Sequence, residues 1–200
     1  MGAIFASLGR TIIAGIVLLI VFIVIAGLGT GAWIRVSDYG WWSFFFRWLH
    51  VLSGVMWIGL LWYFNFVQTP SMPKIPDEQK PAVSKVIAPT ALFWFRWGAM
   101  STIITGLILA TINGYLVQAL SLQRGVHAIG LGMWLGAIMW FNVWFIIWPN
   151  QKKVLGIVQA APDEKAAAGK RAGMASRINT MLSIPMLYFM VAQSHGGVGF

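Results

Sequence analysis

Two stretches decide how this chain is organised: residues His50–Gln68, HVLSGVMWIGLLWYFNFVQ, and residues His127–Phe145, HAIGLGMWLGAIMWFNVWF. Aligned on their histidines, they share the pattern H-x6-W-x-G-x4-F-N at one offset, since 127 − 50 = 77 and 142 − 65 = 77. In a helix, each histidine lies nearly two turns before the tryptophan of its pattern and therefore on the same face. The duplication predicts a paired site between two similar helices that run in the same direction.

Composition indicates a polytopic membrane protein. The chain has 200 residues, of which 58% are hydrophobic and 10% are charged, and its long apolar runs are typical of membrane spans. The absence of cysteine excludes disulfides, thiolate metal sites and covalently attached c-type haem. The net charge of +9 comes from basic residues in short loops beside apolar runs, so it indicates membrane topology and not nucleic-acid binding.

The hydrophobic runs predict five transmembrane helices in a single integral membrane domain, residues 1–200. The predicted spans are residues 11–33, 43–68, 90–113, 125–148 and 177–193. The first run is longer than the apolar region of a signal peptide, which favours an uncleaved anchor. The fold class is therefore an all-α membrane protein. Its second and third helices, and its fourth and fifth, form a parallel internal repeat around a four-helix core.

The connections between these spans carry proline and charge. Prolines from Pro70 to Pro89 predict an ordered loop over residues 69–89, and Pro149 is expected to end the fourth span. Residues 151–176 are basic and alanine-rich, which predicts a short surface helix after Pro162 that is separate from the fifth span.

Charge asymmetry predicts the orientation in a bacterial inner membrane. With five spans, eleven Lys and Arg residues fall on one side and three on the other. The positive-inside rule then places the N-terminus in the cytoplasm and the C-terminus in the periplasm. The side with few charges receives Arg35, Arg47 and Arg124. All three histidines, His50, His127 and His195, are then predicted near the periplasmic ends of their helices.

The paired histidines predict a haem b site. Imidazole is a common axial ligand of haem iron, and helices of a bundle can each supply one. We expect His50 and His127 to be these ligands, with Gly54 and Gly130, about one turn beyond each histidine, leaving room for the macrocycle near the backbone. Trp57 and Trp134 are expected to wall its inner edge. Arg47 and Arg124, each three residues before a histidine, are placed to bind the haem propionates.

Other interpretations of these residues stay open. A histidine in a span can simply hydrogen-bond a neighbouring helix. A copper or zinc site that also uses His195 is a second metal hypothesis, but no span carries a carboxylate or a His-x-x-x-His pair. Amides at the cytoplasmic ends of the spans, with Arg96 and Arg177 near them, can bind a small polar substrate or tie helix ends together. No catalytic residue is predicted.

Four segments carry a resemblance to a known family: HVLSGVMWIGLLWYFNFVQTP, APTALFWFRWGAM, MWFNVWFIIWPNQKK and ASRINTMLSIPMLYFMVAQSH. They resemble the membrane domain of bacterial membrane-bound urate oxidases (urate hydroxylases). The resemblance implies a role in purine degradation, the oxidation of urate to 5-hydroxyisourate. In longer members of that family, a C-terminal cytochrome c domain receives the electrons.

The chain differs from those longer members because it ends at Phe200 and contains no C-x-x-C-H motif. The expected electron acceptor is therefore a separate periplasmic cytochrome c. The alternative function is a non-catalytic or electron-transfer small subunit of a larger respiratory or photosynthetic membrane complex. Besides the lipid bilayer, the expected partners are that cytochrome and either a larger complex or further copies of the chain.

Overall fold

A computed structural model describes residues 2–197, and throughout this range the ordered structure is helical. The chain divides into two compact units, residues 1–42 and 43–200. The first unit holds α1 (Gly2–Phe5) and α2 (Leu8–Thr30). Helix α2 ends at Gly31, whose φ of 69° and N–H bond to the carbonyl of Gly27 form a left-handed cap. It covers most of the predicted first span.

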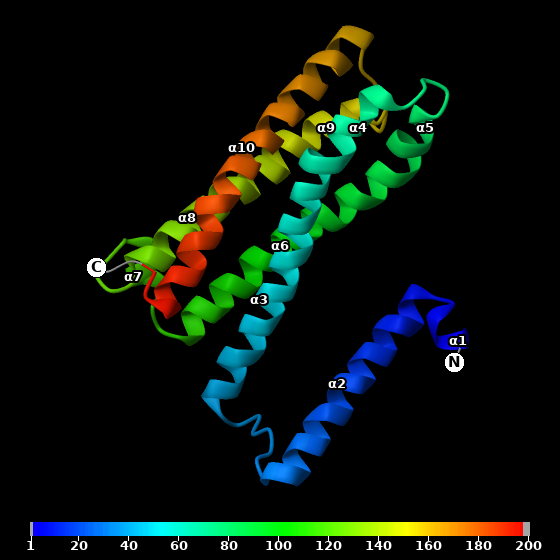
Figure 1. The fold of residues 1–200 in the computed structure, drawn as a ribbon. Coiled ribbons are helices and arrows are strands. Elements are labelled where there is room, and N and C mark those ends of the chain that lie inside the picture. The colour runs from blue at the N-terminus through cyan, green and yellow to red at the C-terminus, as the bar shows by residue number, and fades with distance from the viewer. Residues whose placement is uncertain (1, 198–200) are drawn as a thin grey trace. The chain divides into compact units, whose positions relative to one another are not determined.

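The second unit holds the remaining helices, most of which Figure 1 labels. Helix α3 begins at the end of the first unit and runs on into the second. In chain order the elements are α3 (Tyr39–Trp62), η1 (Tyr63–Gln68), α4 (Thr69–Ser71), η2 (Met72–Lys74), α5 (Lys80–Ala82), η3 (Val83–Ile87), α6 (Ala88–Ile112), α7 (Leu116–Leu120), α8 (His127–Phe141), η4 (Asn142–Ile147), α9 (Trp148–Val154) and α10 (Pro162–His195). Segment η2 is a 3₁₀-helix, whereas η1, η3 and η4 are π-helices.

Within the described residues, four helical stretches are long and apolar enough to cross a membrane: Leu8–Thr30, Tyr39–Lys74, Lys80–Ile112 and His127–Val154. They contain the first four predicted spans nearly in full. The predicted fifth span lies in α10, which is not among the stretches that are long and apolar enough to cross a membrane. Helix α10 is also continuous over 34 residues. The predicted separation of a surface helix from the fifth span, between residues 176 and 177, is therefore wrong.

The three π-helical segments of the described chain each end two residues before a proline: Pro70, Pro89 and Pro149. Proline lacks an N–H, and its ring clashes with the carbonyl four residues earlier in an α-helix. After each segment, the next residue donates its N–H to the carbonyl five residues earlier, from Thr69 to Phe64, Ala88 to Val83 and Trp148 to Val143. This wider register accommodates the proline within a helix that continues.

These π segments correct two predictions. The helix of the predicted fourth span does not end at Pro149, because α9 continues to Val154. The predicted loop over residues 69–89 is largely helical and is interrupted only between Lys74 and Lys80.

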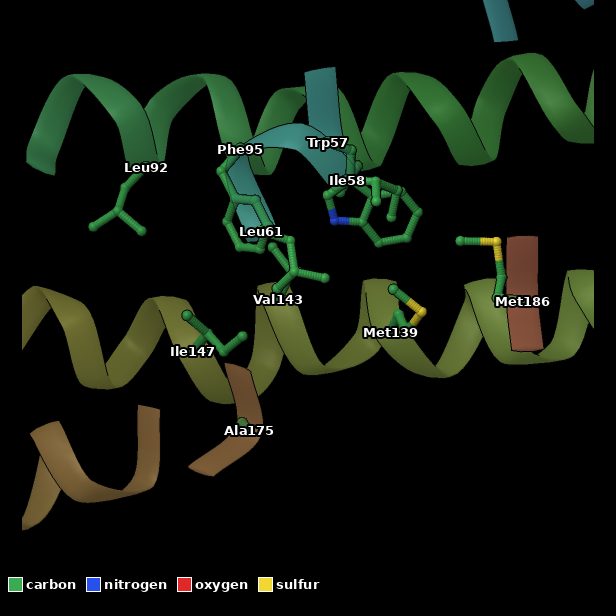
Figure 2. Close-up of a cluster of buried hydrophobic side chains, with 11 residues drawn as sticks. Trp57, Ile58, Leu61, Leu92, Phe95, Met139, Val143, Ile147, Ala175 and Met186 are labelled. Atoms are coloured by element: carbon green, nitrogen blue, oxygen red, sulfur yellow. The ribbon is translucent and has the colours of Figure 1, made fainter. Parts of the chain in front are cut away.

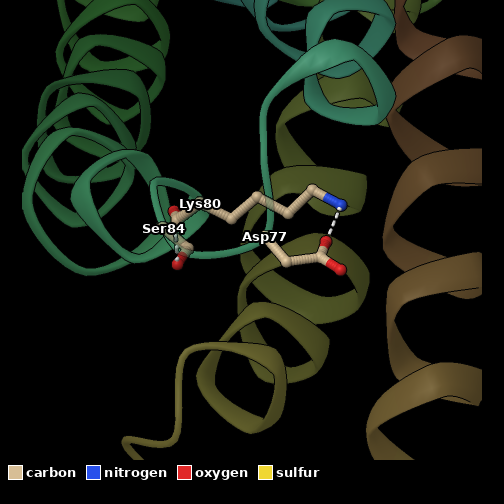
Figure 3. Close-up of polar contacts among 3 residues, drawn as sticks. All are labelled: Asp77, Lys80 and Ser84. Carbon is tan, nitrogen blue, oxygen red and sulfur yellow. Dashed lines mark hydrogen bonds and ion pairs between the residues drawn. The ribbon is translucent and has the colours of Figure 1, made fainter.

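That interruption carries an exposed ion pair, drawn in Figure 3. Nζ of Lys80 lies 2.6 Å from Oδ1 of Asp77, and the ammonium lowers the pKa of Asp77 below its ordinary value. The hydroxyl of Ser84, which lies one turn after Lys80, donates a hydrogen bond to the carbonyl of Lys80. Because the Asp77 side chain is 93% exposed, solvent screens the pair, which orders the turn and adds little stability.

The core of the second unit lies where α3, α6, α8 with η4, and α10 meet (Figure 2). Helix α3 contributes Trp57, Ile58 and Leu61, and α6 contributes Leu92 and Phe95. The facing side chains of the other two helices are Met139, Val143, Ile147, Ala175 and Met186. Inside a membrane such helices associate mainly through van der Waals packing and interhelical hydrogen bonds, because lipid is as apolar as their side chains.

Glycine allows two pairs of these helices to approach closely. A Cβ added at Gly98 of α6 would lie 3.3 Å from the backbone nitrogen of Trp57. One added at Gly132 of α8 would lie 3.2 Å from that of Met190 in α10. Small residues at such contacts let backbones pack side by side. Gly98 therefore allows α6 to pack closely against α3, and Gly132 allows α8 to pack closely against α10.

Candidate functional site

The side chain of His50 extends from α3 and packs against α6. Its Nδ1 is 2.9 Å from the carbonyl oxygen of Thr102. A carbonyl only accepts, so Nδ1 carries the proton and Nε2 keeps a free lone pair. A Cβ at Gly106 would lie 2.8 Å from Cε1 of His50, so the absence of a side chain at residue 106 gives the ring its space. Metal-binding histidines commonly have this arrangement, in which a backbone carbonyl fixes the tautomer and the ring orientation.

His127 occupies a different position along its helix. It is the first residue of α8, whereas His50 lies well inside α3. Ile129, two residues after His127, donates its backbone N–H to the side chain of Gln193 in α10. Gln193 also donates to the carbonyl of Gly125. These bonds tie the start of α8 to the end of α10. The two histidines therefore match in sequence but not in their distance from a helix end.

The residues predicted to surround the ring are also placed unequally. Gly54 faces α6, where an added Cβ would lie 4.0 Å from the methyl group of Thr102. Trp57 is 1% exposed and lies in the core, but its counterpart Trp134 is 48% exposed and donates to the carbonyl of Leu120. At Gly130, the turn beyond His127, the backbone of Ala119 in α7 occupies the space beside the glycine. Open space at His127 is therefore smaller than the sequence predicts.

Both predicted propionate ligands, Arg47 and Arg124, are exposed. Arg47 is close enough to influence Tyr115, in the α6–α7 connection: burial raises the pKa of this phenol and the charge of Arg47 partly opposes the rise. His195, the third possible metal ligand, is exposed at the end of α10, and its ring contacts the carbonyl of Val191 in the same helix. Within the described residues, no group of three His, Asp or Glu side chains is arranged to hold a metal ion.

The amides near the other end of the bundle mainly tie helices together. Asn179 of α10 is fully buried; its side chain accepts from Asn142 at 2.8 Å and donates to the carbonyl of Met139 at 2.9 Å. Asn65 donates to the hydroxyl of Ser176, also in α10. The asparagines of the repeated pattern, Asn65 and Asn142, thus both contact α10.

The sequence patterns singled out only part of a second group of polar atoms, namely Trp57 and Arg96. Six buried side-chain atoms of the described chain lack a hydrogen-bond partner: Nε1 of Trp57, Trp140 and Trp144, Nε and Nη1 of Arg96, and Oε1 of Gln68. The guanidinium carbon of Arg96 lies 3.2 Å from the ring centroid of Trp148, which follows η4. A signal for this group was available in the sequence, because Arg96 is an arginine within an apolar helix.

The comparison with protein families supports a relation to urate oxidases. Residues 115–199 match the family described as Urate oxidase N-terminal. This range contains α7 to α10, and with them His127, Trp140, Trp144 and Asn179. No curated protein and no solved structure matches the chain significantly.

Proposed function

We propose that this protein is a membrane-embedded oxidoreductase of the urate hydroxylase type. The observation that carries the proposal is the family match over residues 115–199. The membrane setting agrees with four stretches long and apolar enough to span a bilayer. In the proposed reaction, urate and water give 5-hydroxyisourate, two electrons and two protons. The electrons pass to a separate periplasmic cytochrome c.

The proposed cofactor is haem b, which would accept electrons from the substrate one at a time. His50 would hold the haem iron, because its Nε2 is free and a carbonyl fixes its Nδ1. His127 is the proposed second ligand. The predicted cradle at Gly130 does not support a ring close to α8, since α7 covers that glycine. The proposal for the cofactor therefore depends chiefly on His50, with Arg47 and Arg124 as proposed partners of the propionates.

Purified protein tests this function directly. We expect a Soret band, a pyridine haemochrome of haem b, and reduction of added cytochrome c that depends on urate. His50→Ala and His127→Ala should each lose the haem. The matched control His195→Ala should keep it, because that ring contacts its own helix. Protein made with ample haem that lacks the band contradicts the cofactor. Co-purification with a large complex and no activity towards urate supports the subunit alternative.

The proposed topology has five spans related by the internal repeat, with the last span in α10. It places the N-terminus in the cytoplasm and the C-terminus in the periplasm of a bacterial inner membrane. A reporter fused after Phe200 tests it, because a fifth span changes the side on which the chain ends. We expect alkaline phosphatase to be active there and green fluorescent protein to be dark. The opposite pair of results leaves four spans and removes α10 from the membrane.

A further inference from the structure

Arg96 is a half-buried cation that has no acidic partner among the described residues. It lies in the candidate span Lys80–Ile112, and none of the three candidate spans between residues 39 and 154 contains Asp or Glu. Its Nε and Nη1 are buried and have no hydrogen-bond partner among the described residues. A buried guanidinium is costly in an apolar setting unless an anion or several acceptors compensate it. The aromatic face of Trp148 beneath it compensates only in part.

The helix that faces Arg96 adds further unused donors. Trp140 and Trp144 lie in α8 and η4, and both have a buried indole N–H without a partner. The ring of Trp144 packs edge to face on Trp97, the residue next to Arg96, with centroids 5.6 Å apart. Trp140 and Trp144 both pack against the core cluster. The interface between α6 and the segment η4–α9 therefore brings together a cation, the indole N–H of Trp144 and the rings of Trp97 and Trp148.

The numbers of donors and acceptors among these unpartnered atoms indicate which kind of ligand would satisfy them. Of the six unpartnered buried atoms, five are N–H donors and one, in Gln68, is an acceptor. Donors in excess call for a ligand rich in acceptors, and the guanidinium calls for negative charge. Indole faces favour a flat ring, which they can stack against.

We propose that Arg96, Trp144 and Trp148 form a binding site for a planar heterocyclic anion, which is the substrate class of this protein. This inference rests on the proposed function and deepens it. The urate anion has the required properties: a flat bicyclic ring, a negative charge and carbonyl oxygens along its edge. The guanidinium fork of Arg96 binds that edge through two parallel hydrogen bonds, and the indole N–H of Trp144 donates to a further carbonyl oxygen.

A lipid phosphate is the other source of an anion at this position. Lys152 also lies near Trp148, with its Nζ 5.9 Å from the ring centroid, and basic and aromatic residues together are common near headgroups. A tetrahedral phosphate makes no use of indole faces, and the indole N–H groups lie buried among helices. These two features favour the planar ligand.

Binding of radiolabelled urate to the full chain in nanodiscs tests the site, by equilibrium dialysis with the electron acceptor omitted. Arg96→Gln should weaken binding about tenfold to a hundredfold, the range for hydrogen bonds to a charged group. Trp144→Phe keeps an aromatic ring, although a smaller one, but removes the N–H, and should weaken binding about fivefold to tenfold. The matched control Arg171→Gln changes an exposed arginine of α10 and should leave the Kd unchanged. Inorganic phosphate should not compete.

The outcomes separate this inference from the proposed function. Binding of urate that depends on Arg96, without oxidation of urate, keeps the site and removes the oxidase. Oxidation with kcat/KM unchanged in Arg96→Gln and Trp144→Phe keeps the oxidase and removes the site. Loss of a retained lipid in Arg96→Gln, with urate binding unaltered, assigns the arginine to the bilayer. Should Arg96→Gln fail to fold, Trp144→Phe, which introduces no polar group and removes no charge, decides.

Discussion

Replacing Gly130 by alanine is expected to destabilise the protein more than any other single methyl group added to α8. The added Cβ would overlap the carbonyl oxygen of Ala119 and would also meet Leu122. Flexible side chains can rotate away from an added atom, but here the obstacle is backbone, in the short helix α7 (Leu116–Leu120). The helices must separate, so we expect a loss of about 3 kcal/mol or more, the upper range for overpacking.

Thermal unfolding in detergent measures this effect. For a chain of this size, a loss of that magnitude lowers Tm by about 6–12 °C. Gly136 provides the matched control, because it lies in the same helix and an added Cβ would meet nothing within 4 Å. Gly136→Ala should leave Tm unchanged or raise it, since alanine favours helix by about 1 kcal/mol over glycine. Equal Tm values for the two variants contradict the close packing of α7 on α8.

Asn179→Ala is expected to have the second largest effect. The Asn179 side chain is fully buried and connects two groups of the facing helix, the amide of Asn142 and the carbonyl of Met139. Its removal leaves the Asn142 amide buried without its acceptor and opens a small cavity. We expect a cost of about 2–3 kcal/mol, in the upper range for a buried group left unsatisfied.

The same unfolding measurement distinguishes this amide from others. Asn150 bonds only the carbonyl of Ile146 in its own helix, so Asn150→Ala should cost less than about 1 kcal/mol. A double-mutant cycle between Asn142→Ala and Asn179→Ala should give a coupling energy near 1 kcal/mol, typical of interhelical hydrogen bonds in membranes. A coupling energy of zero means that the two amides do not interact in solution.

The hydrophobic pattern predicted the helical class and the approximate limits of most helices. It could not predict that helices continue through proline. A proline is normally read as a helix end, and the structure shows that a π segment before Pro89 or Pro149 removes the conflict. Hydropathy also divided α10 into two segments because its first half is basic. Continuity of the backbone depends on tertiary contacts that hydropathy does not report.

The candidate site was predicted less fully than the fold. Sequence symmetry placed Trp57 and Trp134 in equivalent positions, but packing buries the first and leaves the second exposed. The short helix α7 is a neighbour of the second copy that the pattern does not predict: it covers Gly130, and its last residue, Leu120, accepts from Trp134. A sequence repeat puts the same residue types in both copies, but it does not determine which other residues pack around each copy. The sequence shows that Arg96 and Trp144 carry donors, but whether these donors have acceptors depends on the packing around them.

The π segment before Pro149 also determines a rotation. Each residue of an α-helix turns the chain by about 100°, so a turn with one extra residue rotates every later side chain about the helix axis. Trp148 comes directly after η4, and it is this ring that lies beneath Arg96. Pro149, through the π turn that precedes it, thus determines the direction in which Trp148 points from its helix axis, and therefore how its ring faces Arg96.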